Sequence, residues 1–363
     1  PRKLRRQLFV RRDRQTFLGV LRAASQKDHV VVVETSQLPQ AHRGRVATIG
    51  LSAVELQRAG DPHAFGRGSE RPKSFRIVFV LCGHQIDAST HQGTQGANLV
   101  ALRGQGLEAV AVGAQRYSAK NILIATGGKP SVPDIAGREH AITSNDIFDI
   151  DPFPKRLLVV GGGYIACEFA SIFKGLGASV TQLYRGAQVL RGFDEEIRGF
   201  IAAEMVKAGV DLRLNADVAS IVKTAGGLLV TQRDGSTIEA DAVLYATGRV
   251  PLVQGLGLEA LGIAQKPDGA IVVNESYQTS LPHIYAVGDV TARVQLTPVA
   301  LGEAMVVVDH LLGAAAGKAP RSMSYDFIPT AVFTHPNIGT VGFSEAEARE
   351  RFGAVRVFKS EFK

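Results

Sequence analysis

The most regular hydrophobic pattern in the chain lies near its middle. A run of four apolar residues ends at Val160 and enters the turn Gly161-x-Gly163-x-x-Ala166. An amphipathic segment follows this turn, and a second apolar run covers residues 179–184. The apolar runs predict buried strands, and the segment between them predicts a helix. The whole pattern predicts a strand–turn–helix–strand unit of about 30 residues, which is the unit that binds dinucleotides.

Each small residue of this turn has its own expected role. Gly161 permits the tight turn after the strand, and Gly163 lets backbone N–H groups approach a pyrophosphate at the start of the helix. Ala166 allows the helix to pack close to the strand. Because the turn lies between a strand and a helix, we interpret it as a dinucleotide-binding loop.

The residues after the second strand indicate which dinucleotide is bound. A unit specific for NAD carries an acidic residue about 20 residues past the glycines, where it binds the ribose hydroxyls. This chain has Arg185 and Arg191 in that region, and the first carboxylate after them is Asp194. Guanidinium groups form bidentate hydrogen bonds with phosphates, so the pair favours the 2′-phosphate of NADP. The alternative is that both are solvated loop arginines.

Similar patterns predict the remaining elements. Two buried-type strands end in Thr-Gly, at Thr126-Gly127 and at Thr247-Gly248. Because these pairs flank the central unit, they suggest crossing points between two nucleotide-binding domains. Further expected strands cover residues 29–34, 75–81, 121–125, 210–214, 242–246, 270–274 and 283–287; a meander is expected at 218–239, helices at 194–208 and 297–312, and a hairpin and helix within 327–352.

The composition is that of a globular protein, but the charge is unevenly distributed. The 363 residues are 45% hydrophobic and carry a net charge of +7. The first 117 residues hold 18 Lys and Arg against 8 Asp and Glu, whereas the rest of the chain is slightly acidic. A basic segment can bind nucleic acid or a membrane surface. This one has no interleaved aromatics and no recognisable binding motif, so we interpret it as an atypical segment rather than a nucleic-acid site.

Apolar runs and cysteines exclude several other classes. No apolar run approaches the ~20 residues that span a bilayer, and the first residues do not resemble a secretory signal. Cys82 and Cys167 are the only cysteines, and they form neither a CxxC nor a CxxxxC pair. We therefore expect no disulfide framework, no zinc or other metal site, and a location in the reducing cytoplasm.

A second candidate site lies in residues 283–300, HIYAVGDVTARVQLTPVA. Asp289 follows a short apolar run, where its carboxylate can accept hydrogen bonds from a polyol chain. Thr297-Pro298 starts a helix with proline at a favoured position, so the positive helix end would face an electron-rich ring edge. This arrangement suits a flavin, whose pyrimidine edge gains negative charge on reduction. The alternative is a capped helix after a turn.

From about Tyr117 onward the chain resembles the pyridine nucleotide–disulfide oxidoreductases, and within them the glutathione reductase branch. The arginine pair separates it from the NAD-using dihydrolipoyl dehydrogenase branch. The resemblance implies an α/β fold, FAD and NADP(H) as cofactors, glutathione disulfide as substrate and a homodimer. It rests on ILIATGGKPSVPDIAGREHAITSNDIF, RLLVVGGGYIACEFASIF, VLRGFDEEIR, LYATGRVP, HIYAVGDVTARVQLTPVALGEA and IPTAVFTHPNIGTVGFSEAEA, which occur in the family's order.

The resemblance also implies the order of domains. A Rossmann-type NADPH-binding domain at 153–250 is inserted into an FAD-binding domain at 117–152 and 251–320. The start of an α+β interface domain follows at 321–363. Residues 1–116 are expected to be an atypical basic segment in place of most of the FAD domain, and a frame-shifted origin would fit their composition.

Residue roles follow from the same motifs. Tyr164 is similar to the family's gating tyrosine, which covers the flavin until nicotinamide displaces it; the alternative is a half-buried helix tyrosine. Glu168 is expected to contact the nicotinamide amide, and His335 to be structural. The implied NADPH contacts are Gly161, Gly163, Tyr164, Ile165, Glu168, Arg185, Arg191, Gly248 and Arg249, and the implied FAD contacts are Thr126, Gly127, Asp289 and Thr297.

The sequence also departs from the family's pattern. The 363 residues contain neither the redox CxxxxC nor the N-terminal GxGxxG, and the C-terminal His–Glu pair does not occur. Pro1–Leu4 resembles the residues just past the second redox cysteine, with Arg2 in place of a flavin-contacting lysine, and Cys167 is expected to be a core residue. We therefore expect NADP(H) binding with little or no reductase activity, and no stable family-type dimer. The alternatives are a diaphorase-like NADPH oxidase, another NADPH-dependent disulfide reductase, and a non-catalytic or nucleic-acid-binding protein.

Overall fold

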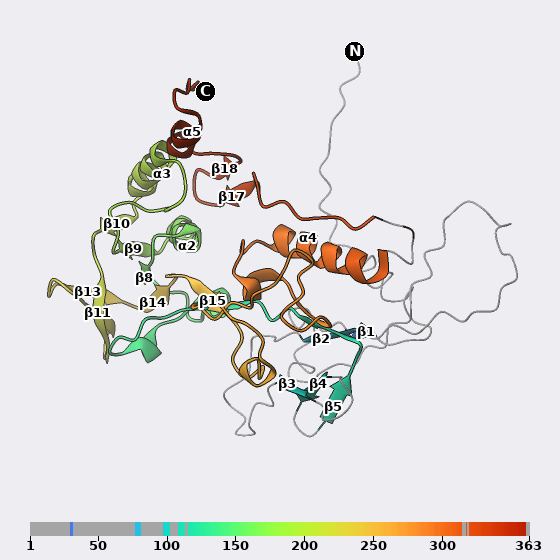
Figure 1. The fold of residues 1–363 in the computed structure, drawn as a ribbon. Coiled ribbons are helices and arrows are strands. Elements are labelled where there is room, and N and C mark those ends of the chain that lie inside the picture. The colour runs from blue at the N-terminus through green and yellow to red at the C-terminus, as the bar shows by residue number, and fades with distance from the viewer. Residues whose placement is uncertain are drawn as a thin grey trace, which may run out of the picture. The chain divides into compact units, whose positions relative to one another are not determined.

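The computed structural model describes residues 30–31, 77–80, 97–101, 108–112, 115–313, 317 and 319–360. Its contacts divide the chain into two compact units, of which unit 1 comprises 1–127 and 251–322 and unit 2 comprises 128–250 and 323–363 (Figure 1). Unit 2 thus begins at Gly128, earlier than the boundary of 153 expected for the inserted domain. The reason is that residues after 128 pair with its sheet: Ile142 N–H donates to Val243 O at 2.9 Å, and Tyr245 N–H donates to Ile142 O at 2.8 Å.

Unit 2 is built on a parallel sheet of four strands in the order β10-β9-β8-β14. Helix α2 (Tyr164–Gly175) connects β8 to β9, and α3 (Glu195–Lys207) connects β9 to β10. The predictions of these elements are confirmed to within one or two residues. The strands are β8 (Arg156–Val160), β9 (Ser179–Tyr184), β10 (Asp211–Leu214) and β14 (Ala242–Tyr245).

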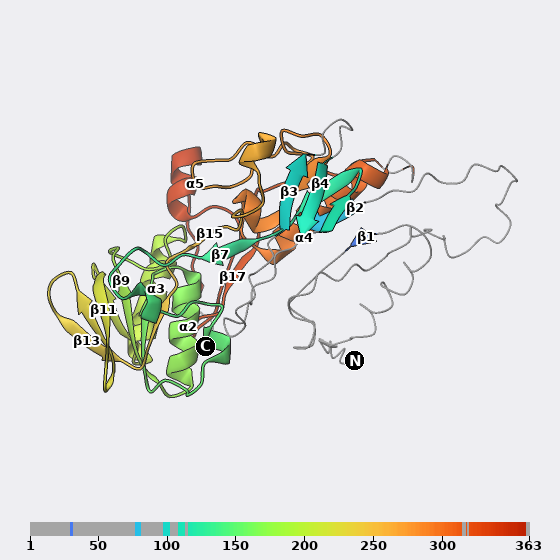
Figure 2. The same cartoon turned by 90° about the horizontal axis from the view of Figure 1, so that it is seen from below.

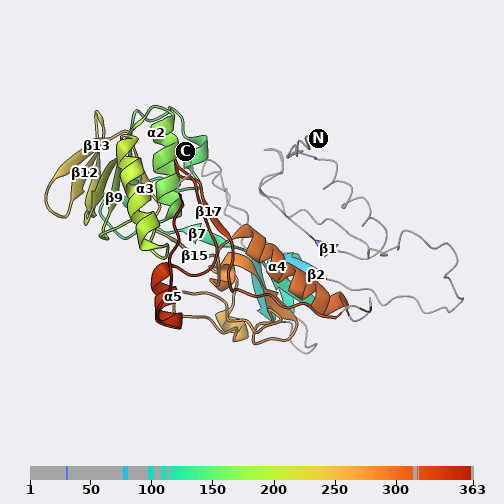
Figure 3. The ribbon, with the colours of Figure 1, turned by 90° about the horizontal axis from the view of Figure 1, so that it is seen from above.

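The side chains of β8 alternate between two cores. Leu157 and Val159 pack into a cluster with residues of α2 and α3, which lie along one face of the sheet (Figures 1 and 3). Leu158 and Val160 pack into a second cluster with an antiparallel sheet on the other face. All four side chains are buried, and each contributes about 1.5–3 kcal/mol of burial free energy. A strand covered on both faces has no polar positions, which explains the continuous apolar run.

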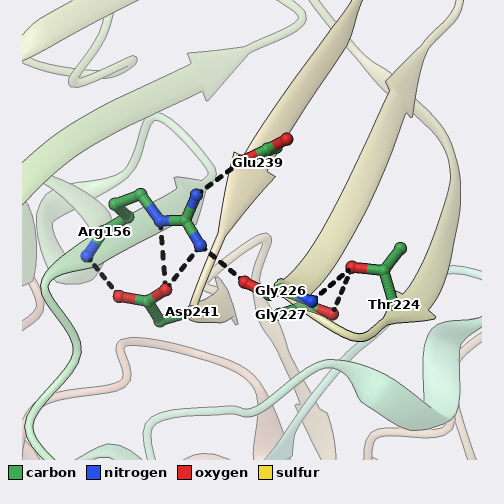
Figure 4. Close-up of polar contacts among 6 residues, drawn as sticks. All are labelled: Arg156, Thr224, Gly226, Gly227, Glu239 and Asp241. Atoms are coloured by element: carbon green, nitrogen blue, oxygen red, sulfur yellow. Dashed lines mark hydrogen bonds and ion pairs between the residues drawn. The ribbon is translucent and has the colours of Figure 1, made fainter.

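The antiparallel sheet on that other face is the predicted meander, formed by β11 (Val218–Thr224), β12 (Gly227–Gln232) and β13 (Thr237–Ala240). Arg156, at the start of β8, fastens it to the parallel sheet (Figure 4). Its guanidinium lies 2.7 Å from the Glu239 carboxylate, 2.8 Å from that of Asp241 and 2.8 Å from Gly226 O. The Arg156 guanidinium holds the pKa of Asp241 below its usual value.

Asp194 precedes helix α3 as its N-cap, and its side chain serves two elements. One carboxylate oxygen accepts the Glu196 N–H at 3.0 Å, which caps the helix. The other accepts the Glu345 N–H at 2.9 Å, at the start of α5 (Glu345–Phe352). These backbone hydrogen bonds, that of Glu345 first, hold the pKa of Asp194 below its usual value. The start of α5 is thereby attached to the start of α3 within unit 2.

That C-terminal segment contains the expected hairpin and helix. Strands β17 (Thr330–Val332) and β18 (Ile338–Thr340) pair antiparallel, and α5 follows them. Ser344 and Glu347 form a capping box at the start of α5. Among the described helices, none combines the length and the apolar character needed to cross a membrane.

Unit 1 contains a second parallel sheet, in the order β1-β2-β6-β16. Strand β1 (Val30–Val31) and strand β2 (Ile77–Val80) fall within two runs that predicted strands in the first third. They pair in register with β6 (Asn121–Ile124), which pairs with β16 (Ile284–Ala286). A separate antiparallel sheet contains β3 (Ala97–Ala101), β4 (Glu108–Val112) and β5 (Gln115–Ser118), and Figure 2 shows β3 and β4 side by side.

The end of unit 1 confirms one predicted element and corrects another. Helix α4 (Thr297–Val308) forms as expected and continues into a π-helical turn, Asp309–Gly313. The strand expected at 270–274 is wrong, since this segment forms only an isolated bridge. The Ile271 N–H donates to Val290 O, whereas the Val272 N–H donates to Ala264 O. The Asn274 N–H already donates to Gln278 O across a turn, so the pairing of this segment does not extend beyond single hydrogen bonds.

The two Thr-Gly crossings have the same hydrogen-bond pattern. In one, the Thr126 hydroxyl donates to Leu252 O at 2.7 Å and the Leu252 N–H donates to Gly127 O at 2.9 Å. In the other, the Thr247 hydroxyl donates to Ser131 O at 2.8 Å and the Ser131 N–H donates to Gly248 O at 3.0 Å. Thr126-Gly127 is thus bonded to Leu252, which lies five residues after Thr247. Thr247-Gly248 is bonded in the same way to Ser131, which lies five residues after Thr126. The short strands β7 (Gly128–Pro130) and β15 (Arg249–Pro251) pair beside them.

Candidate functional site

The glycine loop, residues 161–163, joins β8 to α2. Gly161 has a φ of +142°, and a Cβ there would lie 2.3 Å from Ala246 O. A Cβ at Gly162 would lie 2.4 Å from the ring of Tyr184. Atoms of the protein itself therefore require glycine at both positions, which agrees with the turn expected at Gly161.

Gly163 differs from its neighbours. Its backbone is extended, with φ −80° and ψ 177°, and nothing lies within 4 Å of the position that a Cβ would occupy. No side chain caps α2 at this residue, and the first N–H groups of a helix have no partner within the helix. The structure therefore leaves open space beside an uncapped positive helix end. This is the observation by which the loop fits a pyrophosphate.

The arginine loop, residues 185–192, follows directly on β9. Arg185 and Arg191 are both exposed, and among the described residues neither guanidinium has a hydrogen-bond or ion-pair partner. This loop contacts the glycine loop, because the Leu190 N–H donates to Gly162 O at 2.6 Å. The structure thus places the two predicted recognition elements next to each other.

Two polar residues that shape these loops were not expected from the sequence. The first is Gln182, which is fully buried in β9 and donates from Nε2 to Gly161 O at 2.9 Å. The signal was a glutamine in the middle of an apolar strand. The second is Arg198 on α3, which donates to Gln188 O and to Val189 O at 2.9 and 2.8 Å. Nothing in the sequence distinguished this arginine from a solvated helix residue.

Tyr164 and Glu168 lie one helical turn apart at the start of α2, and Ile165 lies between them in the first turn. All three side chains are half-buried. Glu168 Oε1 accepts the Phe333 N–H at 2.9 Å, just after β17. This contact joins the expected nicotinamide end of the helix to the C-terminal segment, and the sequence did not indicate it. The nicotinamide roles of these residues stay predictions.

Gly248 and Arg249 follow β14 in unit 2. Gly248 has a φ of +135°, a region that favours glycine, and a Cβ there would meet no atom within 4 Å. The half-buried Arg249 donates from its guanidinium to Gly128 O. Arg249 therefore has a structural bond to the neighbouring crossing segment, and its proposed contact with the dinucleotide stays a prediction.

The four residues expected to contact FAD all fall in unit 1. Thr126 is 5% exposed and Gly127 has a φ of +72°. Asp289 is half-buried in a 3-10 turn (Gly288–Thr291) that follows β16, and Thr297 is the exposed first residue of α4. No side chain caps the start of α4. An acceptor beside an open helix end fits the ribityl and pyrimidine part of a flavin, and the roles themselves stay predictions.

The structure places Cys167 in the first turn of α2, fully buried and without a disulfide partner. Burial raises the pKa of its thiol to about 11, so the group stays protonated and unreactive at neutral pH. Cys82 lies outside the described residues, as do Arg2 and most of 1–116. Within the described part, no group of three or more His, Cys, Asp or Glu side chains is placed to hold a metal ion.

Comparison with known proteins identifies related chains. Glutathione reductase from Burkholderia cepacia is 46% identical over 273 residues, which are 74% of this chain and 60% of the relative. Trypanothione reductase from Trypanosoma congolense is 40% identical and covers 73% of this chain and 54% of its own. Among solved structures, the HOCl-induced flavoprotein disulfide reductase RclA from Escherichia coli has a TM-score of 0.64 at 33% identity, covering 70% of this chain and 57% of its own. The chain spans between 48% and 60% of the length of the curated relatives that it matches.

Family models cover most of the sequence. The model described as pyridine nucleotide-disulphide oxidoreductase matches residues 21–304, and the dimerisation domain of the same family matches 328–363. The first match includes residues 21–116, which belong to the basic segment that was expected to be atypical. The chain belongs to the pyridine nucleotide-disulphide oxidoreductase family.

Proposed function

We propose that this chain carries the NADPH-binding apparatus of a glutathione reductase-like flavoprotein. One observation carries the proposal. In unit 2 the glycine loop and the arginine loop are neighbours joined by a hydrogen bond. The glycine loop offers the uncapped start of α2 and the open space at Gly163, and the arginine loop offers two exposed guanidinium groups. Backbone N–H groups at a helix start suit a pyrophosphate, and guanidinium groups suit a phosphomonoester. NADPH has both groups, whereas NADH has only the first.

Each residue then has a defined task. The first turn of α2 binds the pyrophosphate, and Gly163 keeps the space clear. Arg185 and Arg191 bind the 2′-phosphate. At the nicotinamide end, Tyr164 takes the gating role and Glu168 binds the carboxamide. When bound, NADPH supplies a hydride and FAD accepts it.

The flavin contacts are proposed for unit 1. Asp289 accepts hydrogen bonds from the ribityl hydroxyls, and the start of α4 at Thr297 faces the pyrimidine edge. Thr126 and Gly127 lie where β6 ends, at the carboxyl edge where ligands of parallel sheets bind. The relatives named as flavoprotein disulfide reductase and glutathione reductase support FAD as the second cofactor.

Reduction of glutathione disulfide needs a further electron carrier. The 363 residues contain no CxxxxC pair, and the thiol of Cys167 is buried and protonated. Electrons that reach a flavin therefore have no protein dithiol to enter within this chain. We propose NADPH binding as the activity of the chain itself and glutathione disulfide reduction as the activity of its family.

Fluorescence titration with NADPH and NADH tests the proposal. We expect the chain to bind NADPH at least tenfold more tightly, since each lost charge-assisted phosphate contact is worth about 1.5–3 kcal/mol. Replacing both Arg185 and Arg191 by alanine should remove this preference and leave NADH affinity unchanged. Arg213→Ala is the matched control, because Arg213 pairs with Asp211 on β10 and contacts neither loop. Equal affinity of the unaltered chain for both dinucleotides would contradict the proposal.

A coupled assay separates binding from catalysis. We expect no NADPH-dependent reduction of glutathione disulfide by the purified chain. If the preparation is yellow and reduces a dye with NADPH, the diaphorase-like alternative gains support. A colourless preparation that still prefers NADPH supports a binding module without a working flavin.

A further inference from the structure

We propose that Arg198 is a positioning residue for cofactor selectivity: its guanidinium holds the arginine loop in the shape that presents Arg185 and Arg191 to the 2′-phosphate. The inference rests on the proposed NADPH function and deepens it. Arg198 itself makes no contact with the ligand in this proposal. It acts only through the backbone of residues 188 and 189.

The contacts of Arg198 are directed at the loop. Nε donates to Val189 O at 2.8 Å, and Nη2 donates to Gln188 O at 2.9 Å. Nη1 forms an ion pair with Glu195, one turn earlier on α3. The side chain is only 17% exposed, so it is held against the loop rather than solvated. A guanidinium presents its donors in a rigid fork, which matches two successive carbonyl groups.

The loop conformation that Arg198 holds is unfavourable by itself. Leu190 has a φ of +56°, which a leucine rarely adopts. Both Val189 and Leu190 are fully buried, and the Leu190 N–H donates to Gly162 O. Such a conformation persists only where surrounding contacts impose it. Arg198 bonds the two residues immediately before Leu190, so it is one of those contacts.

Both ends of the loop depend on this conformation. Arg191 follows Leu190 directly, so the backbone at 188–190 determines where Arg191 begins. At the other end, the Tyr184 ring lies so close to Gly186 that a Cβ there would be 2.6 Å from it. Residues 186–190 between these two ends connect the proposed phosphate-binding residues Arg185 and Arg191. If this segment relaxes, the spacing between their guanidinium groups is no longer fixed, while Gly161 keeps its hydrogen bonds to Leu183 and Gln182 of β9.

A charge effect and a positioning effect can be separated by substitution. Arg198→Ala removes the fork, and Arg198→Lys keeps the positive charge but can reach only one carbonyl with good geometry. Positioning predicts that lysine restores selectivity only in part. An effect of charge alone predicts full restoration. Arg213→Ala again serves as the control for loss of an arginine elsewhere in unit 2.

The experiment measures dissociation constants of the full chain and its variants for NADPH, NADH, 2′,5′-ADP and 5′-AMP. We expect Arg198→Ala to weaken NADPH and 2′,5′-ADP on the order of tenfold, the scale of losing a charged hydrogen-bond donor. NADH and 5′-AMP should change less than twofold. Trypsin cleavage after Arg191 should become faster in the same variant, because the loop backbone is released.

The outcomes distinguish this inference from the proposed function. If the unaltered chain shows no preference for NADPH, the proposed function fails before any variant is considered. If the unaltered chain prefers NADPH and Arg198→Ala keeps that preference, the positioning role is overturned. Equal loss of NADPH and NADH in Arg198→Ala, or full rescue by Arg198→Lys, also overturns it. Should the alanine variant not fold, the lysine variant decides: a preference equal to that of the unaltered chain contradicts the proposal.

Discussion

The glycine loop and the arginine loop lie against each other, but one is proposed to bind the ligand through its backbone and the other through its side chains. The glycine loop offers backbone N–H groups, so its side chains must be absent. The arginine loop offers side chains, so its backbone must be held. Gly161 and Gly162 are required by neighbouring protein atoms, whereas Arg185 and Arg191 are exposed and have no partner among the described residues. The difference teaches that affinity for the common dinucleotide and selectivity for its phosphate are separable in this fold.

The largest effect is expected from Gly161→Ala. The new Cβ would lie 2.3 Å from Ala246 O at a φ of +142°, so the glycine loop and the backbone just after β14 must move apart. We expect a loss of about 3 kcal/mol or more in the free energy of unfolding and loss of binding for both NADPH and NADH. Urea denaturation and titration measure these changes. A stable variant that still binds would show that the backbone of this loop is less constrained than the structure indicates.

Gly163→Ala is the matched comparison within the same loop. Its Cβ would enter open space with an ordinary backbone conformation, so the unfolding free energy should change by less than about 1 kcal/mol. Affinity for NADPH and NADH should fall by the same factor, at least about tenfold, because the methyl group occupies space needed by the pyrophosphate. Unequal losses of affinity for the two dinucleotides would contradict a role of Gly163 in binding the pyrophosphate that both dinucleotides share.

The preference for NADPH over NADH should depend on pH, because the 2′-phosphate of the ligand changes its charge. A phosphomonoester has a second pKa of about 6, whereas arginine stays charged throughout. The preference for NADPH over NADH should therefore be full above pH 7 and decline several-fold as the pH falls towards 5, because the phosphate loses one of its two charges. Titrations between pH 5 and 8 measure the ratio of the two dissociation constants. A flat ratio would argue against recognition of the dianion by the arginine pair.

The smallest effect is expected at the opposite end of β8. Asp241→Asn weakens the Arg156 network, far from both loops, so dinucleotide binding should not change. The pKa of Asp241 is lowered in the folded state, so its stabilisation is present above the unfolded value of about 4 and is lost as the pH falls through the lower folded value. We expect a Tm decrease of at most about 2–4 °C at pH 7, typical of a screened surface pair. The difference should vanish at strongly acidic pH.

Sequence patterns predicted the frame of the site because its elements are local. The apolar run of β8, the two glycines and the second strand lie within one continuous stretch, and each boundary is determined by nearby residues. The expected NADPH residues all fall in unit 2 and the expected FAD residues in unit 1, which agrees with the predicted order of motifs. The roles of these residues are still predictions.

Tertiary contacts were not predictable in the same way. Arg198 acts on carbonyl groups nine and ten residues away, and Glu168 accepts an N–H from 165 residues away. Neither partner is visible in the local pattern. The strand expected at 270–274 was wrong for a related reason, because Ile271 is buried and forms an isolated bridge, but Val272 is exposed and the Asn274 N–H already donates to Gln278 O across a turn. Apolar character reports burial, while a strand needs a continuous partner.

The reciprocal bonds of the two Thr-Gly crossings bear on how such a molecule is assembled from modules. Ser131 and Gly248 are joined by a backbone hydrogen bond, so a segment of more than a hundred residues leaves and rejoins the neighbouring unit at adjacent points. A module whose two ends meet can be inserted into a host loop, or removed from it, with little displacement of the flanking chain. The two ends of the central segment therefore meet, although residues after 322 also belong to its compact unit and would have to accompany it in any transfer.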